Sequence, residues 1–235
     1  MISGMVMPLS LDRMQFKWSR IGAFMAKRVV RLQPPLILSA AVMTAVTYGI
    51  LQAKGLNIWA VFLGSATLTS PFFSIPWAND IYWTLFVEMQ YYLYIALLFP
   101  LLISQRVQVR WVVVALALAL SLLTQLESWY WMKLTLPFHI PVFMMGYFLF
   151  MIYSRKIKLL EFLVGIVLSG ITCAYVTGHL LGLGYRIVCV ALVTVLMIQL
   201  LRKGWRWLST LGEYSYSLYL IHWSIIGLFY NYVGP

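Results

Sequence analysis

A carboxylate inside an apolar run is the feature of this chain with the clearest chemical potential. Residues 81–103 read IYWTLFVEMQYYLYIALLFPLLI, apolar enough to cross a bilayer, yet Glu88 lies about seven residues from the start. A charge at that depth costs about 2.5–3.5 kcal/mol unless it is paired, protonated or facing water. A reaction site needs such a group and a packed core does not. We therefore favour a functional role for Glu88 over its neutralisation for packing.

Aromatic residues accompany Glu88 along the same run. Trp83 lies five residues before it, and Tyr91 and Tyr92 lie one turn after it. Tyrosine hydroxyls can donate to a carboxylate and an indole can form an apolar wall, so Glu88 could act as a general acid or base in such a pocket. An aromatic belt at the outer membrane interface would explain Trp83 but not Glu88.

A second polar group occurs late in the chain, in LGEYSYSLYLIHW. Ser215, Tyr219 and His222 are spaced four and three residues apart, so they form one polar stripe on an otherwise apolar helix. Histidine is the usual proton carrier near neutral pH. Interhelical hydrogen bonding and a reaction site are equally compatible with this stripe.

A third group is basic, in FMAKRVVRLQPP. Lys27, Arg28 and Arg31 share one face of a helix that enters the membrane. Paired arginines one turn apart make a fork that suits phosphates. A topology anchor that meets anionic lipid is slightly favoured from residue types alone. We expect Pro34-Pro35 to reset the backbone at the start of the next span.

The elements that must position these groups are transmembrane helices. The 235 residues are 63% hydrophobic and 10% charged, whereas soluble domains carry about 25% charged residues. Backbone groups in lipid must be satisfied internally, so all spans should be helical. We predict an all-α, polytopic transmembrane helix bundle of about seven full spans, forming a single domain over residues 1–235. The predicted spans are Pro34–Ala53, Ile81–Ile103, Trp111–Leu126, Leu136–Tyr153, Leu159–Val176, Leu183–Leu201 and Glu213–Val233.

Two further segments are too short or too polar for a full span. Met1–Leu11 is a half-span, and Ile58–Phe73 is predicted to be re-entrant or interfacial. If Ile58–Phe73 does not cross, 14 of the 17 Lys and Arg fall on one side, and the positive-inside rule makes that side cytoplasmic. The four basic loops concerned are Asp12–Arg31, Arg106–Arg110, Arg155–Lys158 and Arg202–Arg206.

The remaining signals are weaker. The net charge of +11 belongs to these loops, which favours membrane topology over nucleic acid as its explanation. Cys173 and Cys189 are expected to be inert buried thiols, and no Cys/His spacing predicts a metal site. Gly146 is expected to let two helices approach closely.

The three groups, in this order, resemble motifs of the acyltransferase 3 family of integral-membrane O-acyltransferases. The segment FMAKRVVRLQPPL resembles its F-x-x-x-R-x-x-R-x-x-P motif, WTLFVEMQYYLY its W-x-L-x-x-E-x-x-F-Y-L helix, and LGEYSYSLYLIHW its late L-G-x-x-S-Y-x-L-Y-L-x-H helix. The opening SGMVM resembles an SGF-type motif that follows the family's first helix. Each motif is moderately specific, and the ordered set is strongly so.

The resemblance implies transfer of an acyl group, commonly acetyl from acetyl-CoA, to a hydroxyl of an envelope carbohydrate or lipid-linked sugar in the bacterial inner membrane. It implies that Arg28 and Arg31 contact the phosphates of the acyl-CoA donor, with no other cofactor bound. Glu88 and Trp83 match the intramembrane Trp/Glu motif, and Tyr219 and His222 match the late Tyr/His motif.

Glu88 and His222 are therefore the expected catalytic residues. The expected substrate-binding residues are Arg28, Arg31, Trp83, Tyr91, Ser215 and Tyr219.

Two departures from the family pattern concern the ends of the chain. The family normally begins with a helix that carries an essential histidine and continues past the late helix with a further span. We therefore expect the native protein to have residues before Met1, and the family pattern leaves residues after Pro235 open. We expect Glu88 to orient that histidine or to bind the acceptor. Two other hypotheses stay open at this point: a transporter or flippase-like protein with Glu88 and His222 on a proton or substrate path, and a non-catalytic remnant.

Overall fold

The computed structural model describes residues 2–46, 57–125 and 135–178, together with residues 196, 199, 219 and 220. The described elements are all helical, as predicted. They are the α-helices α1 (Ile2–Arg13), α2 (Ile21–Thr44), α3 (Ile58–Ala66), α4 (Tyr82–Leu102), α5 (Val107–Leu123), α7 (Leu136–Tyr153) and α8 (Leu159–Thr177), and the short 3-10 helices η1 (Trp18–Arg20) and η3 (Ser70–Phe73).

The chain forms two compact units that interleave along the sequence. Unit 1 contains Met1–Gly22 and Val87–Gly204, and unit 2 contains Ala23–Phe86 and Trp205–Pro235. Helix α4 contributes its first turn to unit 2 and the rest of its length to unit 1. The prediction of a single domain stays a prediction.

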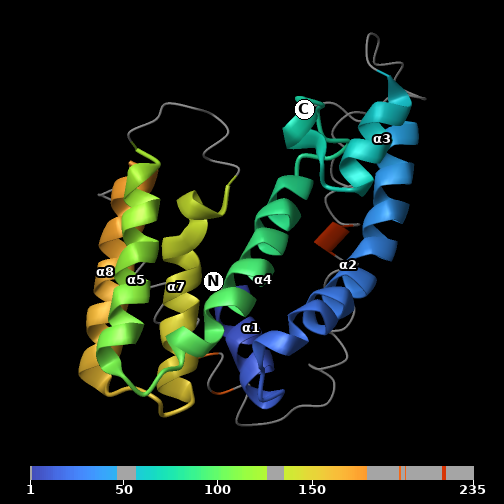
Figure 1. Ribbon diagram of the computed structural model, residues 1–235. Coiled ribbons are helices and arrows are strands. Elements are labelled where there is room, and N and C mark those ends of the chain that lie inside the picture. The colour runs from blue at the N-terminus through green and yellow to red at the C-terminus, as the bar shows by residue number, and fades with distance from the viewer. Residues whose placement is uncertain are drawn as a thin grey trace. The chain divides into compact units, whose positions relative to one another are not determined.

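Unit 1 is built around α7, whose side chains are largely buried. Helices α1, α5 and α8 pack against α7, and α5 also packs against α8 (Figure 1). Glycines allow these close approaches: the Phe148 ring of α7 lies directly over Gly165 of α8, and Gly4 of α1 lies against Phe143 and Gly146 of α7. The prediction that Gly146 permits close helix packing is confirmed.

Ion pairs at one end of unit 1 join segments that are distant in sequence. Lys156, between α7 and α8, donates to Asp12 of α1 at 2.6 Å. Arg110 of α5 pairs with Glu161 in the first turn of α8. Three of the predicted basic segments therefore share one end of this unit. Arg110 itself corrects the prediction, because it lies on α5 and is buried rather than in a loop.

Unit 2 contains α2, α3, η3 and the first turn of α4 around a common apolar core. Leu36 and Ala40 of α2, Val61 of α3 and Tyr82 and Leu85 of α4 belong to this core. Gln33 of α2 donates to the carbonyl oxygen of Ala66, and Ser65 accepts from the backbone N–H of Ala78 at 2.8 Å. These hydrogen bonds fix α3 and the following turn to their neighbours.

The prolines of α2 do not act as predicted. Pro34 and Pro35 lie inside one helix that runs from Ile21 to Thr44, rather than at a reset of the backbone. A proline inside a helix removes one backbone hydrogen bond and bends the helix, and Figure 1 shows α2 changing direction along its length. Buried residues on both sides of the proline pair, including Leu32 and Leu36, hold the helix together.

The predicted spans are supported to different degrees. Three described helices, α4, α7 and α8, are long and apolar enough to cross a membrane, and α5 is a shorter apolar helix of 17 residues. Helix α3 has nine residues, about 14 Å at 1.5 Å per residue, which is far short of a bilayer core. Ile58–Phe73 is thus broken into short pieces, and its interfacial placement stays a prediction. Helix α1 has 12 residues, in keeping with a half-span. The predicted spans Leu183–Leu201 and Glu213–Val233 lie almost wholly outside the described residues.

Candidate active site

Glu88 accepts two short hydrogen bonds on the same carboxylate oxygen. Ser3 Oγ of α1 donates to Glu88 Oε1 at 2.6 Å, and Tyr92 Oη, one turn along α4, donates to it at 2.7 Å. Hydrogen bonds to a charged group contribute about 1.5–3 kcal/mol each. Two of them offset a cost of about 2.5–3.5 kcal/mol for a carboxylate at this depth. Within the described residues, no hydrogen bond to Oε2 is found.

The close packing of α1 on α7 is what brings Ser3 to Glu88. Gly4 follows Ser3, and a Cβ at this position would collide with the backbone carbonyl oxygen of Phe143 and would lie 3.1 Å from the Cα of Gly146. Without a side chain at Gly4, the backbone of α1 lies directly against α7. Sequence reasoning missed Ser3 as a site residue, although the SGMVM segment contained the signal.

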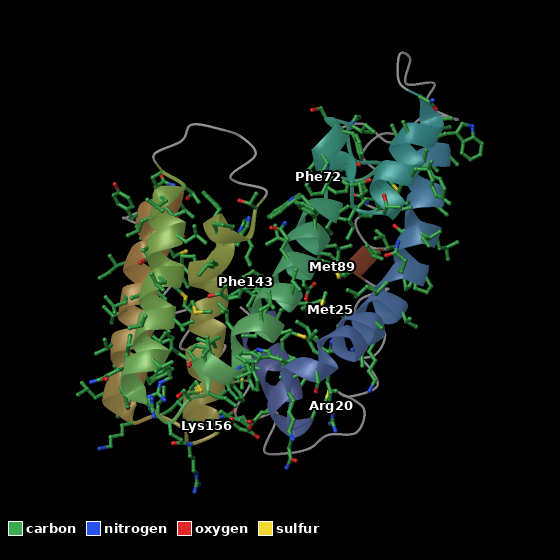
Figure 2. The ribbon with its side chains drawn as sticks, in the orientation of Figure 1. Arg20, Met25, Phe72, Met89, Phe143 and Lys156 are labelled. Carbon is green, nitrogen blue, oxygen red and sulfur yellow. The ribbon has the colours of Figure 1, made fainter. Side chains whose placement is uncertain are left out.

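Tyr91 has a different place from Tyr92. Its side chain is fully buried, and its ring stacks on that of Phe143 with centroids 4.0 Å apart and planes 7° from parallel. Figure 2 shows Phe143 between α7 and α4. The Tyr91 hydroxyl donates to the carbonyl oxygen of Gly4 at 3.3 Å. Tyr91 therefore supports the segment that carries Ser3 and does not bond Glu88. Its role in substrate binding stays a prediction.

Gln90 ties α4 to the start of α7. Its side-chain oxygen accepts from the backbone N–H of Leu136 at 2.9 Å. This N–H belongs to the first turn of α7 and has no partner inside that helix. Tyr91 and Gln90 therefore hold the Glu88 turn of α4 against two other elements of unit 1.

Trp83 lies away from Glu88 around the helix. Five residues of α-helix correspond to a rotation of about 140°, and Trp83 is 36% exposed. The structure does not place its indole as a wall over the carboxylate. The role of Trp83 in substrate binding stays a prediction.

The late motif meets α4 next to Trp83, within unit 2. The hydroxyl oxygens of Tyr219 and Thr84 are 2.8 Å apart, and Thr84 also donates to the carbonyl oxygen of Ile81 at 2.8 Å. The helix that carries Trp83 and the late motif that carries Tyr219 were identified separately in the sequence, and they are in contact through this pair of hydroxyls. Leu220, the residue after Tyr219, is buried in the core of unit 2. Ser215 and His222 lie outside the described residues.

The predicted arginine pair lies on α2. Arg28 is half-buried, with its guanidinium carbon 5.3 Å from the centroid of the Phe24 ring one turn earlier. This arrangement is a cation–π contact. Arg31 is exposed one turn later. Both residues belong to unit 2, as do Trp83 and Tyr219, whereas Glu88 belongs to unit 1.

The Glu88 site has the parts of a proton-transfer centre. One carboxylate oxygen is fixed by two hydroxyls from two helices, which sets the orientation of the carboxyl plane, and the second oxygen can take a proton or hold a substrate hydroxyl. In the part of the chain that the structure describes, no group of three His, Cys, Asp or Glu residues could hold a metal ion.

A comparison of the sequence with models of known protein families finds a match that covers the arginine, Glu88 and Tyr219 motifs together. The model of the acyltransferase 3 family, described as an acyltransferase domain, matches residues 1–235. No curated protein and no solved structure matches the chain. A match over the whole sequence, on a helical chain with three apolar candidate spans, identifies it as an integral-membrane acyltransferase. The chain belongs to the acyltransferase 3 family.

Proposed function

We propose that this protein transfers an acyl group, with acetyl favoured, from acyl-CoA to a hydroxyl of a carbohydrate or lipid-linked sugar of the bacterial envelope, and that it does so in the inner membrane. Membership of an acyltransferase family favours an enzyme over a transporter. The observation that carries the proposal is the Glu88 carboxylate, held by Ser3 and Tyr92 through one oxygen.

Acyl transfer from a thioester has simple requirements. The acceptor hydroxyl oxygen attacks the thioester carbonyl carbon, the carbon–sulfur bond breaks, and the CoA thiolate leaves and takes up a proton. A base must receive the proton of the acceptor hydroxyl. In our proposal Glu88 Oε2 orients the acceptor hydroxyl and receives its proton, and His222 is the second proposed catalytic residue.

The fixed orientation of Glu88 matters for this role. A carboxylate free to rotate would spend little time aligned with the acceptor, whereas two hydroxyl donors on Oε1 hold it in one rotamer. Ser3 and Tyr92 are positioning residues in this proposal, because they act through Glu88.

The donor phosphates are assigned to Arg28 and Arg31. These guanidinium groups are one turn apart on α2, and guanidinium groups bind phosphate through paired hydrogen bonds. Trp83, Tyr91, Ser215 and Tyr219 are the further proposed substrate contacts. The basic loops are proposed to face the cytoplasm, where acyl-CoA is found.

The test is acyl transfer measured in membranes, as CoA thiol release that depends on the acceptor. Glu88→Gln should lower the rate by about 10²–10⁴, because it removes general acid–base function. Ser3→Ala and Tyr92→Phe should each lower it by about tenfold, the effect of losing about 1.4 kcal/mol of alignment.

Matched controls exist in the same unit. The Tyr94 and Ser121 hydroxyls are buried and have no hydrogen-bond partner among the described residues. Tyr94→Phe and Ser121→Ala therefore remove the same groups as Tyr92→Phe and Ser3→Ala without touching Glu88, and should keep at least half of the rate. Full activity in Glu88→Gln, or equal losses in the controls, would contradict the assignment.

A further inference from the structure

Trp18 is anchored by its indole N–H and exposes its ring. Trp18 Nε1 donates to the backbone carbonyl oxygen of Leu97 on α4 at 2.9 Å, while 55% of the residue stays exposed. Pro100, in the next turn, has no N–H to bond the carbonyl oxygen of Ala96, so the hydrogen-bond ladder of α4 is interrupted next to Leu97. The contact fixes the 3-10 helix η1 to the side of α4.

Cations flank this tryptophan, and the carboxylates of unit 1 that the structure describes have other partners. Lys17 and Arg20 are both exposed. Among the described residues of unit 1, Asp12 pairs with Lys156, Glu161 pairs with Arg110, and Glu88 accepts from two hydroxyls. None of these described carboxylates pairs with Lys17 or Arg20. Figure 2 shows Arg20 at the same end of unit 1 as Lys156.

An apolar stripe begins where the indole is attached. Leu97 and Leu93 are one turn apart on α4 and are 49% and 46% exposed. The stripe runs from the Trp18 contact along α4 toward its N-terminal end, away from the basic segment that begins at Arg106 after the helix. An amphipathic ring with cations on one side and exposed leucines on the other is the arrangement expected at the boundary between headgroups and hydrocarbon.

We propose that Lys17, Trp18, Arg20 and the Leu93–Leu97 stripe form a binding site for an anionic phospholipid. The two cations take the headgroup phosphate, the Trp18 ring covers the glycerol region, and one acyl chain lies along Leu97 and Leu93. An anionic membrane lipid fits this surface because it supplies both a phosphate and a chain long enough to cover the leucines. This site goes beyond the proposed acyl transfer and uses none of its residues.

The test measures lipid binding by native mass spectrometry of the detergent-purified protein. The protein is titrated with phosphatidylglycerol, and separately with phosphatidylcholine carrying the same chains. The unmodified protein should bind the first phosphatidylglycerol more tightly than phosphatidylcholine. Lys17→Gln combined with Arg20→Gln should weaken phosphatidylglycerol binding roughly 30-fold, as two cations near a membrane surface predict. Binding of phosphatidylcholine should be unchanged.

Two matched variants locate the effect. Arg155→Gln combined with Lys158→Gln removes the same charge from exposed residues between α7 and α8, and should change the affinity by less than threefold. Trp18→Phe removes the anchoring N–H and keeps an aromatic ring, so it should weaken binding as well.

Three results would overturn the proposal: no preference for phosphatidylglycerol, an equal loss in the Arg155 and Lys158 variant, or displacement of the lipid by coenzyme A. The last result would assign the two cations to the phosphates of the acyl donor.

Discussion

Replacing Gly4 by alanine tests the link between helix packing and the Glu88 site. The new methyl group would overlap the backbone carbonyl oxygen of Phe143 and lie 3.1 Å from the Cα of Gly146. Both obstacles are backbone atoms, which cannot rotate away as a side chain could. Helix α1 must therefore shift by roughly 1 Å to regain ordinary van der Waals contact.

A shift of that size breaks the hydrogen bond from Ser3 to Glu88. The bond measures 2.6 Å between Ser3 Oγ and Glu88 Oε1, and an increase of about 1 Å carries it beyond hydrogen-bonding distance. Overpacking costs about 1–3 kcal/mol, and a hydrogen bond to a charged group contributes about 1.5–3 kcal/mol. Gly4→Ala should thus lower the free energy of unfolding by about 2.5–6 kcal/mol, the sum of the two contributions.

The assay combines stability and activity. Thermal unfolding of the purified protein reports the loss of stability, and thiol release per folded molecule should fall at least as far as in Ser3→Ala. Adding Ser3→Ala to Gly4→Ala should lower activity little further, because the first change has already removed the contact.

Gly22 provides the matched control. A Cβ built at Gly22 meets nothing within 4 Å, and the residue lies near the start of α2. Gly22→Ala should therefore leave activity unchanged and keep or slightly raise stability. If Gly4→Ala behaved like Gly22→Ala in both measurements, the close contact between α1 and α7 would not position Ser3, and our explanation of the site would be wrong.

Two further substitutions test contacts away from Glu88. Thr84→Val removes the hydroxyl that contacts Tyr219 and should cost about 0.5–1.5 kcal/mol of unfolding free energy. In a thermal double-mutant cycle with Tyr219→Phe, additive effects would show that the two hydroxyls do not interact. Arg110→Met leaves Glu161 without its ion-pair partner and should cost about 3–5 kcal/mol. Adding Glu161→Gln should recover part of that loss of thermal stability, and no recovery would argue against the pair.

Hydropathy predicted α4, α7 and α8 to within one residue at each end, whereas α5 begins four residues before the predicted span that starts at Trp111. The run Leu136–Tyr153 is the extent of α7, and Ile81–Ile103 exceeds α4 by one residue at each end. These boundaries follow from local physics, because a membrane helix begins and ends where apolar residues give way to polar ones or to turns. The anomaly of Glu88 could be found in the same way, since it needs only a charged residue in the interior of an apolar run.

The partners of Glu88 divide into one local residue and one distant residue. Tyr92 lies four residues away on the same helix, so helical spacing predicts the contact. Ser3 lies 85 residues away, and it reaches Glu88 because the absence of a side chain at Gly4 allows the backbone of α1 to pack closely against α7. Hydropathy and spacing within one segment contain no information on that contact.

The error at Pro34-Pro35 has a related cause. Proline disfavours the helix interior locally, but the buried side chains of Leu32 and Leu36 flank the pair and stabilise helix on both sides. The low helix propensity of proline was outweighed by the burial of these two leucines, which cannot be predicted from the local sequence. The same limit applies to Thr84, whose partner Tyr219 is 135 residues away.

The interleaving of the two units sets an order for assembly during synthesis. All of unit 1 has been made once the ribosome passes Gly204, whereas unit 2 needs Trp205–Pro235 as well. Because domains form as their residues emerge, the contact of Thr84 with Tyr219 must be among the last to form. Before Tyr219 is in place, the Thr84 hydroxyl still has a hydrogen-bond partner, because it donates to the carbonyl oxygen of Ile81 just before α4. Assembly of unit 2 therefore requires the segment around Tyr219 to dock onto a helix that was made much earlier.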